Sequence, residues 1–230
     1  VTKEYVEGIK AVDNFSIHIR PGEIYGFIGP NGAGKSTTIK MITGITDCDK
    51  GEILINGISS NDEINCKLQF GYVSDSPDMF LKLKGLEYLN FLATIYNVSK
   101  EDSKKRIVEL ADKFELTSAL GDKIQTYSHG MRQKIMVIGA LLHDPKVWIL
   151  DEPLTGLDPK SSFTLKQMMR EHADKGNVVL FSTHVLEVAE KICDKVAIIS
   201  KGKLLFDGTI EEIKVKAGED ESLEKMFLEM

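Results

Sequence analysis

The spacing of apolar residues changes several times along the chain, and each change marks a predicted element. Residues 1–28 are predicted to be rich in strands. Apolar residues there fall at mostly alternate positions, as in a strand with one face buried, and they are Val12, Phe15, Ile17 and Ile19. The unbroken apolar run 24–28 predicts a strand buried on both faces. Glycines follow, and 35–43 predicts a helix.

A helical period begins near Leu86 and continues to Phe114. Two apolar faces are predicted there, the first from Leu86, Leu89, Leu92 or Ala93, and Tyr96, the second from Ile107, Leu110, Ala111 and Phe114. We interpret 77–134 as an inserted helical subdomain.

Strands and helices alternate through the rest of the chain. Strands are predicted at 53–55, 70–73, 147–150, 178–181 and 196–199, and helices from Pro159 and over 185–192. Such alternation is typical of an α/β fold, a mostly parallel sheet with helices on both faces. We therefore expect one domain over 1–230, interrupted by 77–134.

Composition narrows the function classes. Of 230 residues, 42% are hydrophobic, which is enough for a sizeable core, and the net charge of −6 argues against a broad basic surface for nucleic acid. The three cysteines have neither disulfide nor metal-ligand spacing, which favours a reducing compartment. No apolar run is long enough to cross a bilayer and the first residues are polar, so we expect no signal peptide and a protein that needs another chain for any membrane span. Because the sequence starts at Val1, we expect a few natural residues to precede it.

The segment Gly29–Ser36 has the pattern of a phosphate-binding loop between a strand and a helix. Glycines let backbone N–H groups turn toward an anion, and the helix adds its positive end. Lys35 is predicted to reach the β and γ phosphates, and the Ser36 hydroxyl to ligate Mg²⁺.

Two carboxylates, Asp151 and Glu152, follow the predicted strand 147–150. At the carboxyl end of a parallel strand they would face a crevice site, Asp151 toward Mg²⁺ and Glu152 toward the attacking water. On their own they would equally fit two capping carboxylates; the phosphate loop favours the catalytic interpretation.

Three further segments resemble the nucleotide-binding domain of ABC transporters. They are Ser128–Lys134, Asp151–Pro159 and Ser182–His184, and their order along the chain makes the resemblance specific over nearly its whole length. The resemblance implies a P-loop NTPase core with a mostly parallel sheet, an N-terminal antiparallel β subdomain and an inserted α-helical subdomain. It also implies ATP and Mg²⁺ as cofactors.

The family pattern carries over residue by residue. It implies nucleotide contacts from Tyr5, Asn31, Gly32, Ala33, Gly34, Lys35, Ser36 and Thr37. Ser128, His129 and Gly130 would cap the γ-phosphate held by the opposite subunit, and Asp158 would lie at the dimer seam. His184 would contact that phosphate and position Glu152. Tyr5 could instead be an ordinary strand aromatic.

The implied mechanism is a head-to-tail dimer closed by two ATP molecules and opened by hydrolysis. The partners would be a second copy or a homologous ATPase subunit, and separate transmembrane permease subunits. The protein would be peripheral, on the cytoplasmic face of the cell membrane. The turn Gly156–Pro159 and the segment His184–Glu190 resemble those of small-molecule or peptide exporters, so the resemblance favours export over import. A soluble ABC ATPase of translation or DNA maintenance is the rival, although such proteins usually carry two such domains or long coiled coils.

This sequence departs from the family pattern twice. Asp75 occupies the usual place of a glutamine, and His129 that of a glycine. We predict Asp75 as a further Mg²⁺ ligand, with a solvated loop carboxylate as the alternative. His129 could donate to the opposite γ-phosphate or lie along the dimer seam. The segment Pro77–Leu83 could pack inside the insertion or line a groove for the permease.

Overall fold

The computed structural model describes residues 1–78 and 80–217. The elements in chain order are β1 (Lys3–Val6), β2 (Ile9–Val12), β3 (Ile24–Ile28), α1 (Lys35–Ile42), β4 (Leu54–Ile55), β5 (Ile58–Ser59), α2 (Glu63–Lys67), β6 (Phe70–Val73), α3 (Gly85–Ile95), α4 (Lys100–Lys113), η1 (Thr117–Ala119), η2 (Ile124–Thr126), α5 (His129–Leu141), β7 (Val147–Leu150), α6 (Pro159–Asp174), β8 (Val178–Thr183), α7 (Leu186–Ile192), β9 (Lys195–Ser200), β10 (Lys203–Thr209) and α8 (Ile210–Ala217).

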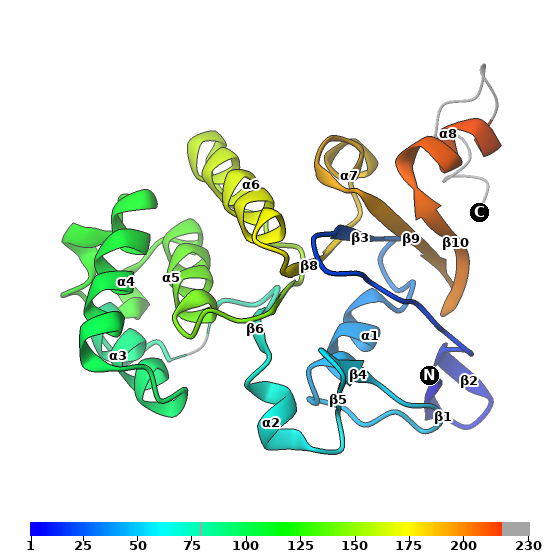
Figure 1. Ribbon diagram of the computed structural model, residues 1–230, viewed down its shortest axis with the longest axis horizontal. Coiled ribbons are helices and arrows are strands. Elements are labelled where there is room, and N and C mark those ends of the chain that lie inside the picture. The colour runs from blue at the N-terminus through cyan, green and yellow to red at the C-terminus, as the bar shows by residue number, and fades with distance from the viewer. Residues whose placement is uncertain (79, 218–230) are drawn as a thin grey trace.

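A six-stranded sheet organises the chain. Its strand order is β10-β9-β3-β8-β7-β6, and only β10 runs antiparallel to its neighbour. Two small antiparallel hairpins, β1–β2 and β4–β5, lie beside it near the N-terminus (Figure 1). The α/β class with a mostly parallel sheet and a separate antiparallel part is therefore confirmed.

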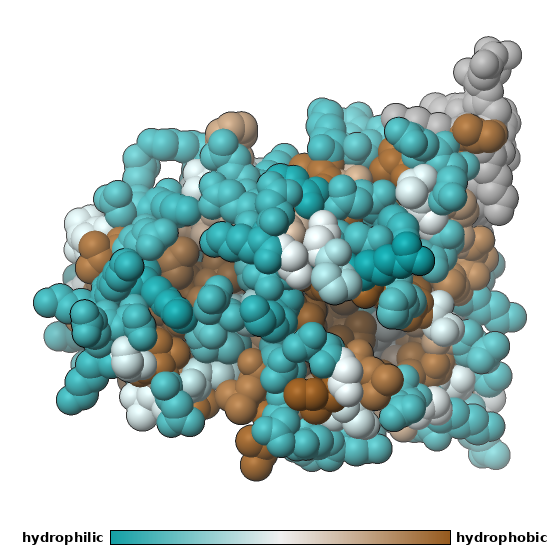
Figure 2. Space-filling view, in the orientation of Figure 1, coloured by the Kyte–Doolittle hydropathy of each residue, from teal (hydrophilic) through white to brown (hydrophobic). Residues whose placement is uncertain are grey.

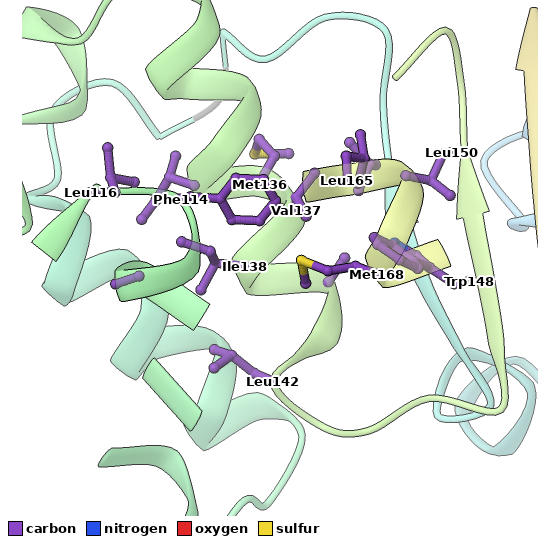
Figure 3. Packing of buried hydrophobic residues seen from close by; sticks show 14 of the residues in the cluster. Phe114, Leu116, Met136, Val137, Ile138, Leu142, Trp148, Leu150, Leu165 and Met168 are labelled. Atoms are coloured by element: carbon purple, nitrogen blue, oxygen red, sulfur yellow. The ribbon is translucent and has the colours of Figure 1, made fainter. Parts of the chain in front are cut away.

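The sheet is buried on both faces because alternate residues of each central strand enter different cores. In β7, Trp148 and Leu150 join the cluster formed with α3 to α6, whereas Ile149 joins the cluster on the side of α1. All five residues of β3 are buried, as the unbroken apolar run predicted. Figure 3 shows α5 residues Val137 and Ile138 within the first cluster.

The helical segment between β6 and β7 differs from its prediction at one residue. The second predicted face, from Ile107 to Phe114, lies against the core. In α3, however, the buried residues are Gly85, Tyr88, Leu89 and Ala93, and Leu86 is 43% exposed. A Cβ on Gly85 would lie 2.3 Å from the Tyr127 hydroxyl, so close packing there turns Leu86 outward. α5 extends past Lys134, so the predicted boundary of the insertion lies within a helix.

The predicted strand over Val12–Ile19 ends at Val12. The segment beyond it keeps the predicted alternation, with Phe15 buried and Ser16 and His18 exposed. Among the described residues it joins no sheet, and together with β4 it lines a groove of about 530 Å³. Apolar side chains are visible in a hollow right of the centre in Figure 2. The strand predicted at 53–55 is likewise shorter, as β4 begins at Leu54.

None of the described helices combines the length and apolar character needed to span a membrane.

Close backbone contact between β6 and α5 generates a stability prediction. A Cβ on Gly71 would lie 2.0 Å from the Ala140 carbonyl oxygen, so Gly71→Ala must push strand and helix apart. We expect a loss of about 1–3 kcal/mol in the free energy of unfolding, measured by urea denaturation. Gly121→Ala is the control, because nothing lies within 4 Å of that Cβ. Equal stability of the two variants would contradict the prediction.

Candidate nucleotide site

The phosphate-binding loop joins β3 to α1, as the sequence predicts. Gly34, with φ of 109°, precedes the helix. A Cβ there would lie 2.6 Å from the Ala11 carbonyl oxygen, and one on Gly29 would lie 2.5 Å from that of Ile199. Glycine is therefore required at both positions, because backbone from β2 and β9 closes around the loop.

The start of α1 suits an anion. Gly34 offers no side chain to cap the first amide groups, and no acidic residue stands in the first turn. A helix N-terminus with free N–H groups carries partial positive charge, which attracts phosphate. Among the other loop residues, Asn31 and Gly32 are exposed and Ala33 is buried, while Ser36 and Thr37 are half-buried in the first turn.

Lys35 is almost fully buried, with 6% of its surface exposed. Its Nζ donates to the carbonyl oxygens of Gly29 at 2.6 Å and Pro30 at 3.3 Å. Glu152 Oε1 lies 3.7 Å away. Burial lowers the pKa of Lys35, and the charges of Glu152 and Asp151 oppose that shift. The ammonium is thus held at the loop, where a phosphate would replace its carbonyl partners.

Asp151 is fully buried and half satisfied. Its Oδ1 accepts a hydrogen bond from Ser182 Oγ, whereas Oδ2 has no partner among the described residues. Burial raises the pKa of this carboxyl; the hydrogen bond from Ser182 and the nearby Ser36 hydroxyl oppose the shift, and the charges of Asp75 and Glu152 add to it. A buried carboxylate with an unpaired oxygen and two acidic neighbours is suited to bind a cation.

Magnesium fits this arrangement. Mg²⁺ is usually held by one or two carboxylates together with phosphate oxygens and water. The Ser36 hydroxyl lies near enough to Asp151 to lower the pKa of its carboxyl, so both could serve one ion. Across the described part of the chain, no three His, Cys, Asp or Glu side chains are grouped as a metal site. An ion here would therefore depend on nucleotide phosphate for the rest of its coordination.

Glu152 is held in an uncommon backbone conformation, with φ of 47°. Its backbone N–H donates to Ser182 Oγ at 2.9 Å, and its Oε2 lies 3.1 Å from His184 Nδ1. Because a carboxylate only accepts, Nδ1 of His184 carries the hydrogen. The parallel register, Leu150 opposite Phe181, brings these strand ends together.

Asp75 follows β6 at the same edge of the sheet. It is exposed, and its Oδ1 accepts from Ser74 Oγ at 3.1 Å. Its charge reaches the site, since it adds to the raised pKa of Asp151. Burial is the main cause that raises the pKa of Tyr72 to about 12, and the charge of Asp75 adds to that shift as well. Asp75 thus lies within electrostatic range of the candidate Mg²⁺ position.

The signature segment begins α5. Ser128 caps the helix, its Oγ accepting from Met131 N at 3.2 Å, and His129 and Gly130 form the first turn. α5 packs on the edge strand β6, whereas the phosphate-binding loop follows β3, with β7 and β8 between them. Helix α5 and helix α1, which follows the phosphate-binding loop, stand well apart in Figure 1. Within one chain, the signature therefore lies away from the loop.

Asp158 caps α6 and is engaged within its own chain. It accepts hydrogen bonds from Ser161 N at 2.9 Å and Ser161 Oγ at 2.6 Å, and Lys134 Nζ lies 3.3 Å away. These contacts, the hydrogen bonds from Ser161 first, lower the pKa of Asp158. Its place at a dimer seam stays a prediction.

Tyr5 lies on the β1–β2 hairpin with 57% of its surface exposed. Lys3 Nζ lies 5.7 Å from its ring centre. The hairpin reaches the loop through Ala11, so an exposed aromatic ring on it is available for stacking.

The structure thus brings together the loop residues, Asp151, Glu152, His184 and Asp75, and leaves Ser128 to Gly130 at a distance. Sequence analysis included Ser182 in the segment Ser182–His184 but gave it no role, whereas it bonds both Asp151 and the Glu152 backbone. Its position directly after the predicted strand 178–181 was the available signal.

Comparison with known proteins identifies the family. Residues 12–155 match the ABC transporter family. The ABC-type transporter ATP-binding protein EcsA of Bacillus subtilis is 38% identical over 219 residues, covering 94% of this chain and 89% of that protein. The linearmycin resistance ATP-binding protein LnrL of the same organism is 34% identical over 210 residues, covering 91% and 68%.

Solved structures agree. The ATP-binding subunit of an ABC transporter has a TM-score of 0.93 at 33% identity, covering 99% of this chain and 95% of that one. The post-hydrolysis dimer of the ATP-binding cassette MJ0796, bound to ADP and Pi, has a TM-score of 0.80 at 25% identity, covering 91% and 95%. On the family match, the similarity to curated relatives and the shared fold, this chain belongs to the ATP-binding, ATP-hydrolysing subunits of ABC transporters.

Proposed function

We propose that the chain powers an ABC exporter, as a dimer beneath separate membrane-spanning permease subunits on the cytoplasmic face of the cell membrane. The observation that carries this proposal is the distance between the two halves of the site. The phosphate-binding loop follows β3, whereas the capped helix start at Ser128 belongs to α5, which packs on β6.

Two chains arranged head to tail would bring these halves together. The signature of one chain, with Ser128, His129 and Gly130, would face the γ-phosphate in the other, and Asp158 would approach the seam. A helix start capped by Ser128 is suited to meet that anion. The cassette MJ0796, which is 26% identical over 91% of this chain, has been solved as a dimer, and this supports the same assembly here.

The residues of one chain would divide the chemistry as follows. Lys35 and the loop amides would bind the β and γ phosphates, and Asp151 and Ser36, with Asp75, would hold Mg²⁺. Bound Mg²⁺ would neutralise charge on the phosphates. Glu152 would orient water and accept its proton, and His184, through its contact with Glu152, would fix that carboxylate. Tyr5 would stack on adenine.

Export is favoured over import by one relative, which is named for linearmycin resistance. Removing a toxic compound from the cell is one way to confer resistance, and the relative covers most of this chain. We propose the same direction here.

The helical segment 77–134 is proposed to act as a subdomain that receives the permease. Phe80 is 38% exposed, and its ring centre lies 5.3 Å from Tyr88 and 5.8 Å from Phe91, which is itself 45% exposed. Leu81 and Leu83 pack against the core, while residue 79 lies outside the described residues. Phe80 has φ of 56°, an unfavourable conformation for a phenylalanine that suggests a functional role.

The first prediction for this function concerns turnover. Lys35→Ala should weaken ATP binding and abolish hydrolysis, because the buried cation of the loop is lost. Glu152→Gln should retain binding, stop hydrolysis and give an ATP-dependent dimer, because the loop stays intact while the carboxylate is removed. Phosphate release and size-exclusion chromatography with ATP test both. Sustained hydrolysis by Glu152→Gln would overturn its assigned role, and a monomer under all conditions would overturn the dimer.

The second concerns Asp75. Asp75→Asn should raise the Mg²⁺ concentration for half-maximal hydrolysis, because one carboxylate near the proposed ion is neutralised without change of shape. The control is Asp112→Asn, the same charge change at an exposed site at the end of α4. Identical Mg²⁺ titrations for the two variants would identify Asp75 as a solvated loop residue.

The third concerns docking. Phe80→Asp should uncouple hydrolysis from transport while the domain still folds, because aspartate tolerates positive φ well and the ring is partly exposed. Val108→Asp, on α4 at 56% exposure, is the control. Transport by the complex in membrane vesicles is measured beside ATPase activity and thermal melting. Full transport by a normally melting Phe80→Asp protein argues against docking there.

A further inference from the structure

One face of α5 contacts the turn that follows Glu152. His129, Gly130, Gln133 and Lys134 are spaced so that they share a helix face. Each of them touches the turn 153–158, so the signature helix and the turn are joined within one chain.

The closest contact is between His129 and Gly156. A Cβ on Gly156 would lie 2.3 Å from His129 Cδ2 and 2.9 Å from His129 Nε2, so the edge of the ring lies directly against the Gly156 backbone. Gly156 has φ of 77°, a conformation that favours glycine. On the other side, a Cβ on Gly130 would lie 2.9 Å from the Gly156 carbonyl oxygen. The first turn of α5 therefore rests on this one residue.

Two polar contacts hold the ends of the turn. Gln133, 2% exposed, places Nε2 at 3.5 Å from the Pro153 carbonyl oxygen, and Lys134 Nζ lies 3.3 Å from Asp158 Oδ2. Inside the turn, two backbone hydrogen bonds are long, with Thr155 N 3.2 Å from Glu152 O and Leu157 N 3.3 Å from Leu154 O. The turn is thus held by α5 in addition to the packing of Leu154 and Leu157 against the core.

We propose that His129 is a positioning residue for ATP hydrolysis: its ring, packed on Gly156, holds the turn 153–158 and thereby the carboxylate of Glu152. This rests on the proposed role of Glu152. The turn starts at the residue after Glu152, so a shift of the turn moves the Glu152 backbone. The Glu152 carboxylate would then move relative to its close neighbours His184 and Lys35. A glycine at position 129 could not make this contact.

The rival role for His129 is a hydrogen bond to phosphate in the opposite subunit. The two roles need different parts of the ring, since packing needs its shape whereas the phosphate needs its N–H. His129→Phe keeps a flat ring and removes the nitrogens. His129→Ala removes the ring but is a better helix former than histidine, so it does not loosen α5 itself.

Amide hydrogen exchange of the nucleotide-free protein tests the contact without any turnover or dimer. The backbone amides of Thr155 and Leu157 are the probes, and those in the middle of α5 are the internal reference. His129→Ala should speed exchange in the turn by about tenfold with the α5 amides unchanged, and His129→Phe should exchange at the wild-type rate. Unchanged exchange in His129→Ala would overturn the proposal.

Steady-state kinetics test the consequence. His129→Ala should lower kcat by about tenfold, while ATP affinity, measured in the Glu152→Gln background, stays at its original value. His129→Phe should lose much less of kcat than His129→Ala, because its ring still packs on Gly156. If His129→Phe loses kcat as fully as His129→Ala, the nitrogen is what matters and the positioning role is wrong.

A double-mutant cycle gives the direct evidence for the pair. Gly156→Ala should lower kcat much more in the wild-type background than in the His129→Ala background, because only the first contains the ring that the new Cβ meets. Backbone strain from positive φ is common to both backgrounds and cancels. Additive effects would overturn the proposal. Should Glu152→Gln itself hydrolyse ATP, the role of Glu152 falls, while the exchange result still decides whether His129 holds the turn.

Discussion

The parallel register of the central strands is the constraint on which the site depends. Since β3, β8, β7 and β6 point the same way, their carboxyl ends share one edge of the sheet. That edge receives the phosphate-binding loop, the two carboxylates, His184 and Asp75. A reversal of any one strand would carry its group to the opposite edge, about 15 Å away for a strand of five residues.

Buried charge is the second constraint. Asp151 and Lys35 are both buried. Burial raises the pKa of Asp151 and lowers the pKa of Lys35, so it favours the neutral form of each. Each is opposed by groups around it, but Asp151 retains an unpaired oxygen among the described residues. A Mg²⁺–nucleotide complex would supply the missing cation and the missing anion together. We therefore expect the site to bind the pair more strongly than either component.

Helix α5 connects the helical region to the candidate site. α5 packs its apolar side between α3, α4 and the sheet, while its first turns contact the turn after Glu152. A force applied to the helices would thus have a short route of packed atoms to the carboxylate of Glu152. In the proposed dimer the same helix start would face a second chain, so one element could respond both to a partner and to its own site.

The sequence predicted most of the elements and the candidate residues of the site, because apolar runs, glycine spacing and the phosphate-loop pattern are local features. Unbroken apolar runs predicted β3 and β7, and glycine spacing predicted the loop. The sequence-based prediction was wrong where contacts with distant residues set the local structure. Leu86 is exposed because Gly85 packs closely against Tyr127. The segment after Val12 keeps the alternation of a strand but pairs with no strand among the described residues. The contacts of Ser182 with the Asp151 carboxylate and the Glu152 backbone, and of His129 with Gly156, became visible in the tertiary structure alone. Such contacts join residues far apart in sequence, and their geometry follows from strand register and helix packing rather than from residue type.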